Sequence, residues 1–244
     1  MSGFLLKKRV LEKSADPFGK PFPVFAALGD SVTEGCFGIY KTGDASLETE
    51  YDSANAYAAY FARMAAEYYP RAPITVVNAG ISGDNAANGF RRLARDILPH
   101  HPDLVAVSYG LNDFTAGPAG LDGYTASLRG IFRTLKENGA EAVFLTPNMI
   151  ADTVSPELTD PFLRAVAEGI VKANEGDTLG AYVRAAKEVC REEDVPVVDI
   201  YEDWVKMKEN GVNITRLLAN RINHPTAEMN RHTAFLLFRT VFGF

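Results

Sequence analysis

Residues 24–31 read Val-Phe-Ala-Ala-Leu-Gly-Asp-Ser, an apolar run that ends in a glycine and two polar residues. A short run that is apolar at consecutive positions is typical of a strand buried on both faces of a parallel sheet. Similar runs follow along the chain at Ile74–Val77, Leu104–Ser108, Ala142–Thr146 and Val195–Ile200. The sequence therefore predicts a sheet of five buried strands.

Amphipathic segments with a helical period separate the predicted strands. They are Ala54–Tyr68, Asn85–Leu98, Tyr124–Asn138 and Thr178–Glu192, and a last one, Thr226–Phe238, follows Pro225, a residue suited to a first helical position. This alternation predicts an α/β fold with three α/β/α layers and right-handed crossovers. Because no repeat, low-complexity tract or linker interrupts it, we expect one domain over residues 23–244, with residues 1–22 as an N-terminal extension packed on it.

Composition narrows the kind of protein that this chain can be. It has 25 basic and 31 acidic residues among 244 and a formal net charge of −6, so it lacks the positive field of non-specific nucleic-acid binders, and we expect no nucleic-acid partner. Hydrophobic residues make up 47% and charged residues 23%, which excludes global disorder. Cys36 and Cys190 are too few for a disulfide scaffold and are predicted to be ordinary, partly buried thiols.

The chain carries no signal for a membrane span or a secretory leader. The charge-free stretch Ala72–Gly83 is shorter than the about 18 residues that a spanning helix needs. The basic residues Lys7-Lys8-Arg9 are followed by Val10-Leu11 and then Glu12, so no apolar leader segment develops. We therefore expect a cytoplasmic protein.

Two predicted connections are longer than a turn requires. One spans Gly35–Ser53, and the other spans Pro147–Gly176 and is expected to contain a helix over Pro161–Lys172. In an open parallel sheet, ligands bind outside the carboxyl ends of the strands, which is where both connections would lie. Long connections at this edge are more often functional than accidental.

Small polar clusters follow the carboxyl ends of the predicted strands. They are Gly29-Asp30-Ser31, Asn78-Ala79-Gly80-Ile81-Ser82-Gly83 and Gly110-Leu111-Asn112-Asp113, and Asn223-His224-Pro225 precedes the last helix. A serine becomes a nucleophile when a base takes its proton, and histidine does this best near neutral pH. Acyl transfer also needs donors for an oxyanion, which backbone N–H groups at a glycine and a side-chain amide supply. One edge of the sheet thus offers a nucleophile, a base and two kinds of donor.

Each cluster taken alone also has a purely structural interpretation. A Gly-Asp-Ser after a strand can be a turn with a helix N-cap, and Gly80 and Gly83 can relieve crowding at a turn. Asn112 can cap a loop, and His224 can be a surface residue. All four clusters in order, at the ends of predicted strands or the start of the last helix, favour the chemical interpretation.

These clusters resemble the four blocks of the SGNH (GDSL-type) hydrolase family, over nearly the whole chain after residue 22. The resemblance implies a flavodoxin-like sheet of five parallel strands in the order 2-1-3-4-5, and hydrolysis of a small-molecule ester through an acyl-enzyme, with no cofactor and no metal. By this match Ser31 is the nucleophile and His224 the general base. The oxyanion hole would consist of the backbone N–H groups of Ser31 and Gly83 and the side-chain amide of Asn112. Thr33 replaces the last glycine of the Gly-x-Ser-x-Gly elbow, which disfavours the α/β-hydrolase fold.

The chain departs from the family at one position. The family usually places an aspartate three residues before the histidine, and here that residue is Arg221. An arginine cannot accept a hydrogen bond, so we expect its side chain to point away from His224, towards solvent or an acid such as Asp203. The candidates for the group that orients His224 are a backbone carbonyl and the side chains of Asn220, Asp203 and Glu228.

We expect a serine esterase that acts on a small or medium carboxylic ester, with an O-acetylated sugar among the candidates. Phe37, Tyr40 and Tyr51 could line its substrate pocket or lie in the core. The alternatives are a thioesterase or lysophospholipase, and a catalytically silent binding domain. The remaining histidines, His100, His101 and His232, do not have the spacing of a metal site, and no glycine-rich phosphate loop is present.

Overall fold

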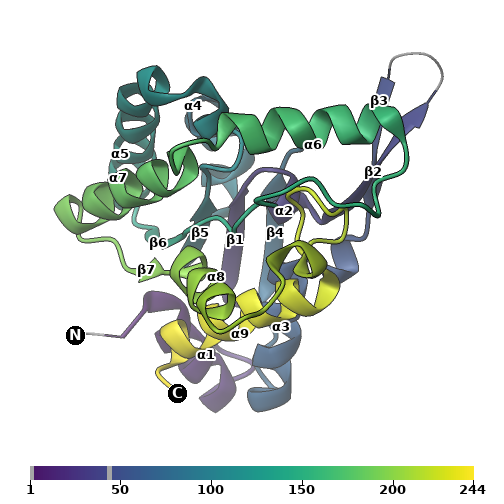
Figure 1. The fold of residues 1–244 in the computed structure, drawn as a ribbon. Helices are drawn as coiled ribbons and strands as arrows, with labels where there is room; N and C mark the ends of the chain where they lie inside the picture. Colours follow the sequence, from purple (N-terminus) through teal and green to yellow (C-terminus); the bar gives the residue numbers. More distant parts are fainter. Residues whose placement is uncertain (1–2, 43–45) are drawn as a thin grey trace.

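A five-stranded sheet lies at the centre of the computed structural model, which describes residues 3–42 and 46–244 (Figure 1). From edge to edge its strands are β4 (Thr75–Gly80), β1 (Val24–Gly29), β5 (Leu104–Ser108), β6 (Glu141–Leu145) and β7 (Val197–Val198). Each strand pairs in parallel with its neighbour. When these five strands are numbered by their order along the chain, their order in the sheet is 2-1-3-4-5. The predicted fold and strand order are therefore confirmed.

Successive residues of β1 enter different apolar clusters on the two faces of the sheet. Phe25 and Ala27 belong to one cluster, and Ala26 and Leu28 belong to the other. Because both faces are buried, the strand is apolar at every position. Helices α1 (Leu5–Ala15), α3 (Tyr57–Tyr68), α8 (Ile200–Glu209) and α9 (Ala227–Phe242) cover the first face, and α4 (Ala86–Asp96), α5 (Leu121–Glu137) and α7 (Thr178–Glu192) cover the second (Figure 1).

Helix α6 (Pro161–Ala173) lies above the carboxyl ends of the strands (Figure 1). Its N-cap is Asp160, whose carboxylate accepts the N–H groups of Phe162 and Leu163. The predicted helix in this long connection is confirmed to within one residue. The shorter elements are α2 (Ser31–Glu34) and the 3₁₀ helices η1 (Ser53–Asn55), η2 (Leu98–His100), η3 (Asp113–Ala116), η4 (Pro118–Gly120) and η5 (Ile214–Leu217).

The other long connection contains an antiparallel hairpin that the sequence analysis did not predict. Strands β2 (Cys36–Thr42) and β3 (Ser46–Tyr51) pair outside the central sheet, with a register shift between Cys36 and Gly38. Figure 1 shows this hairpin projecting beyond the body of the fold. Near the main body, Ile39 packs against a small cluster that contains Ile222. The hairpin therefore lies beside the segment that leads to His224.

Two predicted boundaries are wrong for reasons of helix capping. The apolar run Val195–Ile200 forms only the two-residue strand β7, because the carboxylate of Asp199 accepts the N–H of Glu202 and starts α8 at Ile200. Helix α9 starts at Ala227, because Thr226 is its N-cap. Pro225 therefore lies before the cap, not at the first helical position.

Helix α1 was also not predicted, although it belongs to the core. Its residues Leu6 and Val10 are fully buried among side chains of the first face. Lys13, also buried, donates through Nζ to the carbonyls of Pro17 and Lys20, at 2.6 Å each. The division of the chain into an N-terminal extension, residues 1–22, and a single domain, residues 23–244, stays a prediction. None of the helices in the described part of the chain has the length and apolar character to cross a membrane.

Candidate active site

The turn after β1 places Ser31 at the carboxyl edge of the sheet. Asp30 is the N-cap of α2, where its carboxylate accepts the N–H of Val32 at 3.0 Å. Ser31 is the first residue of this one-turn helix and is 5% exposed. Burial raises the pKa of Asp30 to about 7, and the neighbouring carboxylates of Asp113 and Asp84 add to the rise.

His224 reaches Ser31 from the other end of the chain. Its Nε2 lies 2.9 Å from Ser31 Oγ, although the two residues are 193 positions apart. Asn220 holds the turn that carries His224, because its Oδ1 accepts the backbone N–H groups of Ile222, Asn223 and His224 at 3.0 Å each. Both Ser31 and His224 are buried. The structure thus forms the hydrogen bond that a serine nucleophile and its base require.

The other ring nitrogen of His224 faces groups that are not acids. Nδ1 lies 3.5 Å from Cys36 Sγ and 3.2 Å from Asn220 Nδ2. Oδ1 of Asn220 is occupied by backbone donors, and its Nδ2 donates to Asn223 Oδ1 at 2.9 Å, so Asn220 offers no acceptor to the ring. Burial lowers the pKa of His224 to about 4, and a hydrogen bond with the backbone of Phe37 opposes this effect.

The acids considered for the third position lie away from His224. Asp203 Oδ2 contacts His232 Nε2 at 2.6 Å. Glu228 lies in the first turn of α9, where its own N–H and Thr226 lower the pKa of its carboxyl. Across residues 3–42 and 46–244, no carboxylate forms a hydrogen bond or ion pair with His224.

Arg221 turns away from the site, and its partner differs from the expected one. It adopts a left-handed backbone with a φ of 58°. Its Nε donates to Glu157 Oε2 at 2.7 Å and its Nη1 to the carbonyl of Leu218 at 2.6 Å. The expected partner, Asp203, is engaged with His232 instead.

Gly83 lies in the tight turn that follows β4. Its φ is 76°, a left-handed conformation that favours glycine. Gly80, earlier in the same segment, has no room for a side chain, since a Cβ there would overlap the backbone of Glu34. The carboxylate of Glu34 also accepts the N–H and the hydroxyl of Ser82, at 2.6 and 2.8 Å. The turn is therefore fixed against the helix that starts at Ser31.

Asn112 follows β5 and lies against the turn that contains Gly83. Its Nδ2 donates to the backbone carbonyl of Asp84 at 2.8 Å. The neighbouring carboxylate of Asp113 accepts the N–H groups of Gly110 and Ala86, at 3.0 Å each. Burial raises the pKa of Asp113 to about 6, which these backbone N–H groups oppose. The loops that carry Gly83 and Asn112 are thus joined directly.

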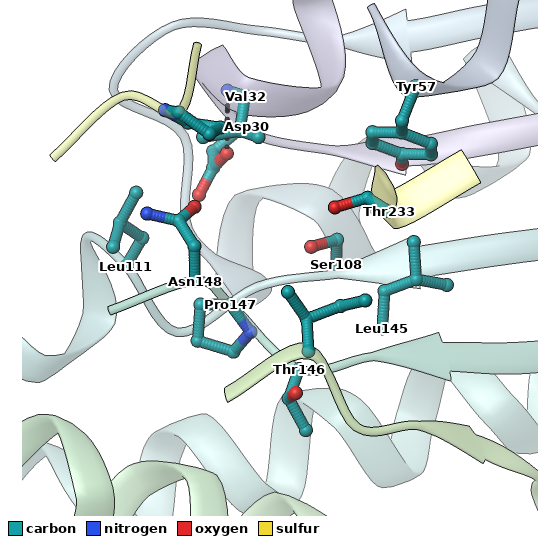
Figure 2. Close-up of a pocket in the computed structure, with 12 residues that line it drawn as sticks. Asp30, Val32, Tyr57, Ser108, Leu111, Leu145, Thr146, Pro147, Asn148 and Thr233 are labelled. Atoms are coloured by element: carbon teal, nitrogen blue, oxygen red, sulfur yellow. Dashed lines mark hydrogen bonds between the residues drawn. The ribbon is translucent and has the colours of Figure 1, made fainter. Parts of the chain in front are cut away.

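A small cavity lies beside the turn of Ser31, although neither Ser31 nor His224 lines it (Figure 2). Its volume is about 20 Å³, which is enough for about one water molecule. Asp30 and Val32, the sequence neighbours of Ser31, line it, and Asn148 faces it from the segment after β6. Pro225, the residue after His224, also lines it. Asn148 Nδ2 also donates to the carbonyl of Asn223 at 2.9 Å, which links this segment to the histidine turn.

The contacts of Cys36 and Phe37 with His224 were not predicted from the sequence. Cys36 is fully buried beside the imidazole, and burial raises the pKa of its thiol to about 12. Tyr40 and Tyr51 are each 51% exposed and so are not core residues. The Tyr51 hydroxyl donates to Ser82 Oγ at 3.3 Å, next to Gly83.

Comparisons with known proteins show the family of the chain. The model of the GDSL-like lipase/acylhydrolase family matches residues 27–232. The chain belongs to this family. It is 27% identical over 190 residues to an acetylxylan esterase of Geobacillus stearothermophilus, covering 70% of this chain and 73% of that protein. It is 36% identical over 77 residues to an arylesterase of Vibrio mimicus, covering 30% and 36% of the two proteins.

Solved structures of esterases share the fold. A catalytic mutant of an acetylxylan esterase from Geobacillus stearothermophilus aligns with a TM-score of 0.65 at 22% identity, over 91% of this chain and 94% of that one. A two-domain esterase active on acetylated mannans aligns with a TM-score of 0.68 at 16% identity, over 98% of this chain and 53% of that one. Family membership and the esterase relatives together identify this GDSL-like chain as a serine ester hydrolase.

Proposed function

We propose that this GDSL-like hydrolase removes acetyl groups from O-acetylated sugars through an acyl-enzyme on Ser31. The observation that carries the proposal is the 2.9 Å contact between Ser31 Oγ and His224 Nε2. In the first step Nε2 takes the hydroxyl proton while Oγ bonds to the ester carbonyl carbon. The tetrahedral intermediate then expels the sugar oxygen, which receives the proton from Nε2. Water repeats the sequence on the acyl-enzyme and releases acetate.

The oxyanion of this reaction would be held by the backbone N–H groups of Ser31 and Gly83 and by the amide of Asn112. The contact between Asn112 Nδ2 and the Asp84 carbonyl supports this assignment, because it holds the amide beside the turn of Gly83. Donors fixed in advance stabilise developing charge without reorganising during the reaction.

For the orientation of His224, we propose a backbone carbonyl in place of an acid. The proton on Nδ1 needs an acceptor, so that Nε2 stays free to receive the serine proton. The backbone of Phe37, whose hydrogen bond with His224 raises the pKa of the imidazole, would supply this acceptor, whereas Asn220 offers none. Asn220 would instead position His224 through the backbone of the turn.

The name of one relative supports a short acyl group. The matched relative from Geobacillus stearothermophilus is named an acetylxylan esterase. The exposed ring of Tyr51 beside Ser82 would offer a flat surface to the sugar.

A panel of substrates tests this proposal. Activity is measured on p-nitrophenyl esters of increasing acyl length and on acetylated xylo-oligosaccharides, with release of acetate followed for the sugars. We expect kcat/KM to be highest for acetyl and to fall by about tenfold or more for longer acyl chains. A kcat/KM that rises with acyl length would contradict the proposal and favour a thioesterase or lysophospholipase.

The pKa of His224 sets the expected pH dependence. The base is active when its imidazole is neutral, which is the state above its pKa, so kcat/KM should rise with pH and then level off. Because burial lowers this pKa from 6.5 to about 4, the half-maximal value should lie near pH 4. Initial rates on p-nitrophenyl acetate check this, with enzyme returned to neutral pH to verify that it stayed folded. A midpoint near 6.5 would contradict the buried state of the base.

Two substitutions test whether a distant carboxylate orients His224. Asp203→Asn and Glu228→Gln should each change kcat/KM by less than about tenfold, far below the about 10⁴-fold loss expected for a triad acid. The reason is that Asp203 contacts His232 and Glu228 lies at the start of α9. A loss of about a thousandfold in either folded variant would show that the acid takes part.

A further inference from the structure

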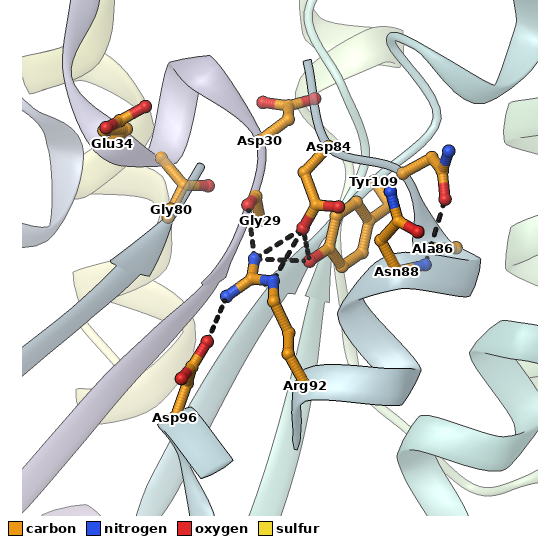
Figure 3. A network of polar contacts seen from close by, with 12 residues as sticks. Gly29, Asp30, Glu34, Gly80, Asp84, Ala86, Asn88, Arg92, Asp96 and Tyr109 are labelled. Carbon is orange, nitrogen blue, oxygen red and sulfur yellow. Dashed lines mark hydrogen bonds and ion pairs between the residues drawn. The ribbon is translucent and has the colours of Figure 1, made fainter. Parts of the chain in front are cut away.

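A single guanidinium contacts the segments that carry all the proposed oxyanion donors (Figure 3). Arg92 lies in α4, and its side chain is 8% exposed. Its Nη2 donates to the carbonyl of Gly29 at 3.0 Å and to the Tyr109 hydroxyl at 2.9 Å. Its Nε donates to Asp84 Oδ2 at 2.8 Å, and Nη2 lies 2.6 Å from the same oxygen.

Each of these partners lies close in sequence to one proposed donor. Gly29 is two residues before Ser31, Asp84 directly follows Gly83, and Tyr109 is three residues before Asn112. The three segments end different strands of the sheet, β1, β4 and β5. The guanidinium therefore connects three parts of the site that have no covalent link nearby.

Asp84 extends this connection to two of the donors. Its carboxylate accepts the Tyr109 hydroxyl at 3.0 Å as well as Arg92. Its backbone carbonyl accepts the side-chain amide of Asn112 at 2.8 Å. A displacement of Asp84 would thus move the N–H of Gly83 and the Asn112 amide together. Burial raises the pKa of Tyr109 well above its usual range, so its hydroxyl remains a donor.

The packing around the network leaves it little freedom. Asp84 is 5% exposed and Tyr109 is fully buried. Gly89, one turn before Arg92, allows the Tyr109 ring to approach α4, because a Cβ at Gly89 would overlap the hydroxyl. Glycine weakens the interior of a helix, so the close approach comes at some cost to α4.

We propose that Arg92 is a positioning residue of the oxyanion site, one that holds the segments of Ser31, Gly83 and Asn112 at the spacing which lets their donors converge. This inference rests on the proposed function. The planar guanidinium satisfies two carboxylates, those of Asp84 and Asp96, and also a carbonyl and a hydroxyl at fixed angles, which a lysine ammonium on its flexible stem does not. Misplacing catalytic groups by about 1 Å can lower the rate by about a hundredfold.

The test compares the same substitution at two positions of α4. Arg92→Lys keeps the charge beside Asp84 but loses the planar fork. Arg95→Lys is the matched control, since Arg95 is largely exposed and bonds to Asp96. For Arg92→Lys we expect kcat on p-nitrophenyl acetate to fall by about 10- to 100-fold with KM within about threefold. Arg95→Lys should match the wild type.

A second readout separates positioning from a loss of folded protein. Phenylboronic acid forms a tetrahedral adduct with an activated serine, so its inhibition constant should rise in Arg92→Lys by the same factor as kcat falls. The pH midpoint of kcat/KM should not move, because Arg92 has no contact with His224. Tyr109→Phe removes one hydroxyl and leaves the charge pair intact, so it provides a variant that folds if Arg92→Lys does not. Tyr109→Phe should lower kcat by a smaller factor than Arg92→Lys does.

Specific outcomes would overturn the inference. The first is a kcat of Arg92→Lys equal to that of Arg95→Lys. The second is a loss of kcat that matches the fraction of unfolded enzyme, while the inhibition constant of phenylboronic acid stays unchanged. If Arg92→Lys does not fold, a Tyr109→Phe enzyme with wild-type kcat would overturn it. Failure of the proposed function is distinct: the wild type would then neither hydrolyse acetyl esters nor react at Ser31 with a fluorophosphonate.

Discussion

Replacing Ser31 by alanine is expected to abolish ester hydrolysis and to leave the fold intact. The hydroxyl is the atom that would bond to the acyl carbon, and its contact with His224 Nε2 is the hydrogen bond through which it would be activated. Removal of a catalytic serine lowers kcat by up to about 10⁶-fold. The lost hydrogen bond is worth about 1 kcal/mol, so the melting temperature should change by about 2–4 °C.

The measurement for Ser31→Ala combines activity with covalent labelling. Hydrolysis of p-nitrophenyl acetate is followed beside the mass shift produced by a fluorophosphonate, which reacts with an activated serine. Ser127→Ala, a serine of α5 whose hydroxyl donates to the carbonyl of Gly123, is the control and should keep full activity and full labelling. If Ser31→Ala retains more than a few per cent of the wild-type rate, the nucleophile has been assigned wrongly.

Replacing Asn112 should reduce the rate strongly without a comparable loss of substrate binding. Asn112→Ala removes one donor to the oxyanion while the contact between Ser31 and His224 remains, so kcat should fall by about 10²–10³-fold with a smaller change in KM. Asn112→Asp should be worse, because it places a carboxylate where negative charge develops and where the carbonyl of Asp84 expects a donor.

Steady-state kinetics on p-nitrophenyl acetate separates the two parameters. Asn138→Asp, at the exposed end of α5, introduces the same charge far from the site and should not alter either of them. A rise in KM with kcat unchanged would mean that Asn112 binds substrate and does not stabilise the transition state.

The sequence predicted the parts of the fold in which local pattern and tertiary packing agree. Within Val24–Leu28, every residue from Phe25 to Leu28 belongs to an apolar cluster, so the pattern identified a buried strand directly. The run Val195–Ile200 predicted too long a strand, because the first residue of α8, Ile200, is as apolar as the strand before it. The hairpin β2–β3 lies outside the central sheet, so it has no continuous apolar run to reveal it.

The same distinction applies to the site. Ser31, Gly83, Asn112 and His224 stand in recognisable blocks, and the structure brings these blocks to one edge of the sheet. The surroundings of His224 Nδ1 could not be predicted, because Cys36 is 188 positions away in the sequence. Cys36 contacts this nitrogen because the hairpin folds beside the turn that carries His224. The contribution of Phe37 comes from its backbone, which has no sequence signature.

The left-handed backbone of Arg221 bears on any attempt to engineer a conventional triad. The side chain at this position contacts Glu157 and the carbonyl of Leu218 and has no contact with His224 in the part of the chain that the structure describes. An aspartate introduced there by back-mutation to the family consensus would face another carboxylate and not the imidazole. Consensus design would therefore have to rebuild the whole turn from Asn220 to His224, since its backbone donors are already committed to Asn220 Oδ1.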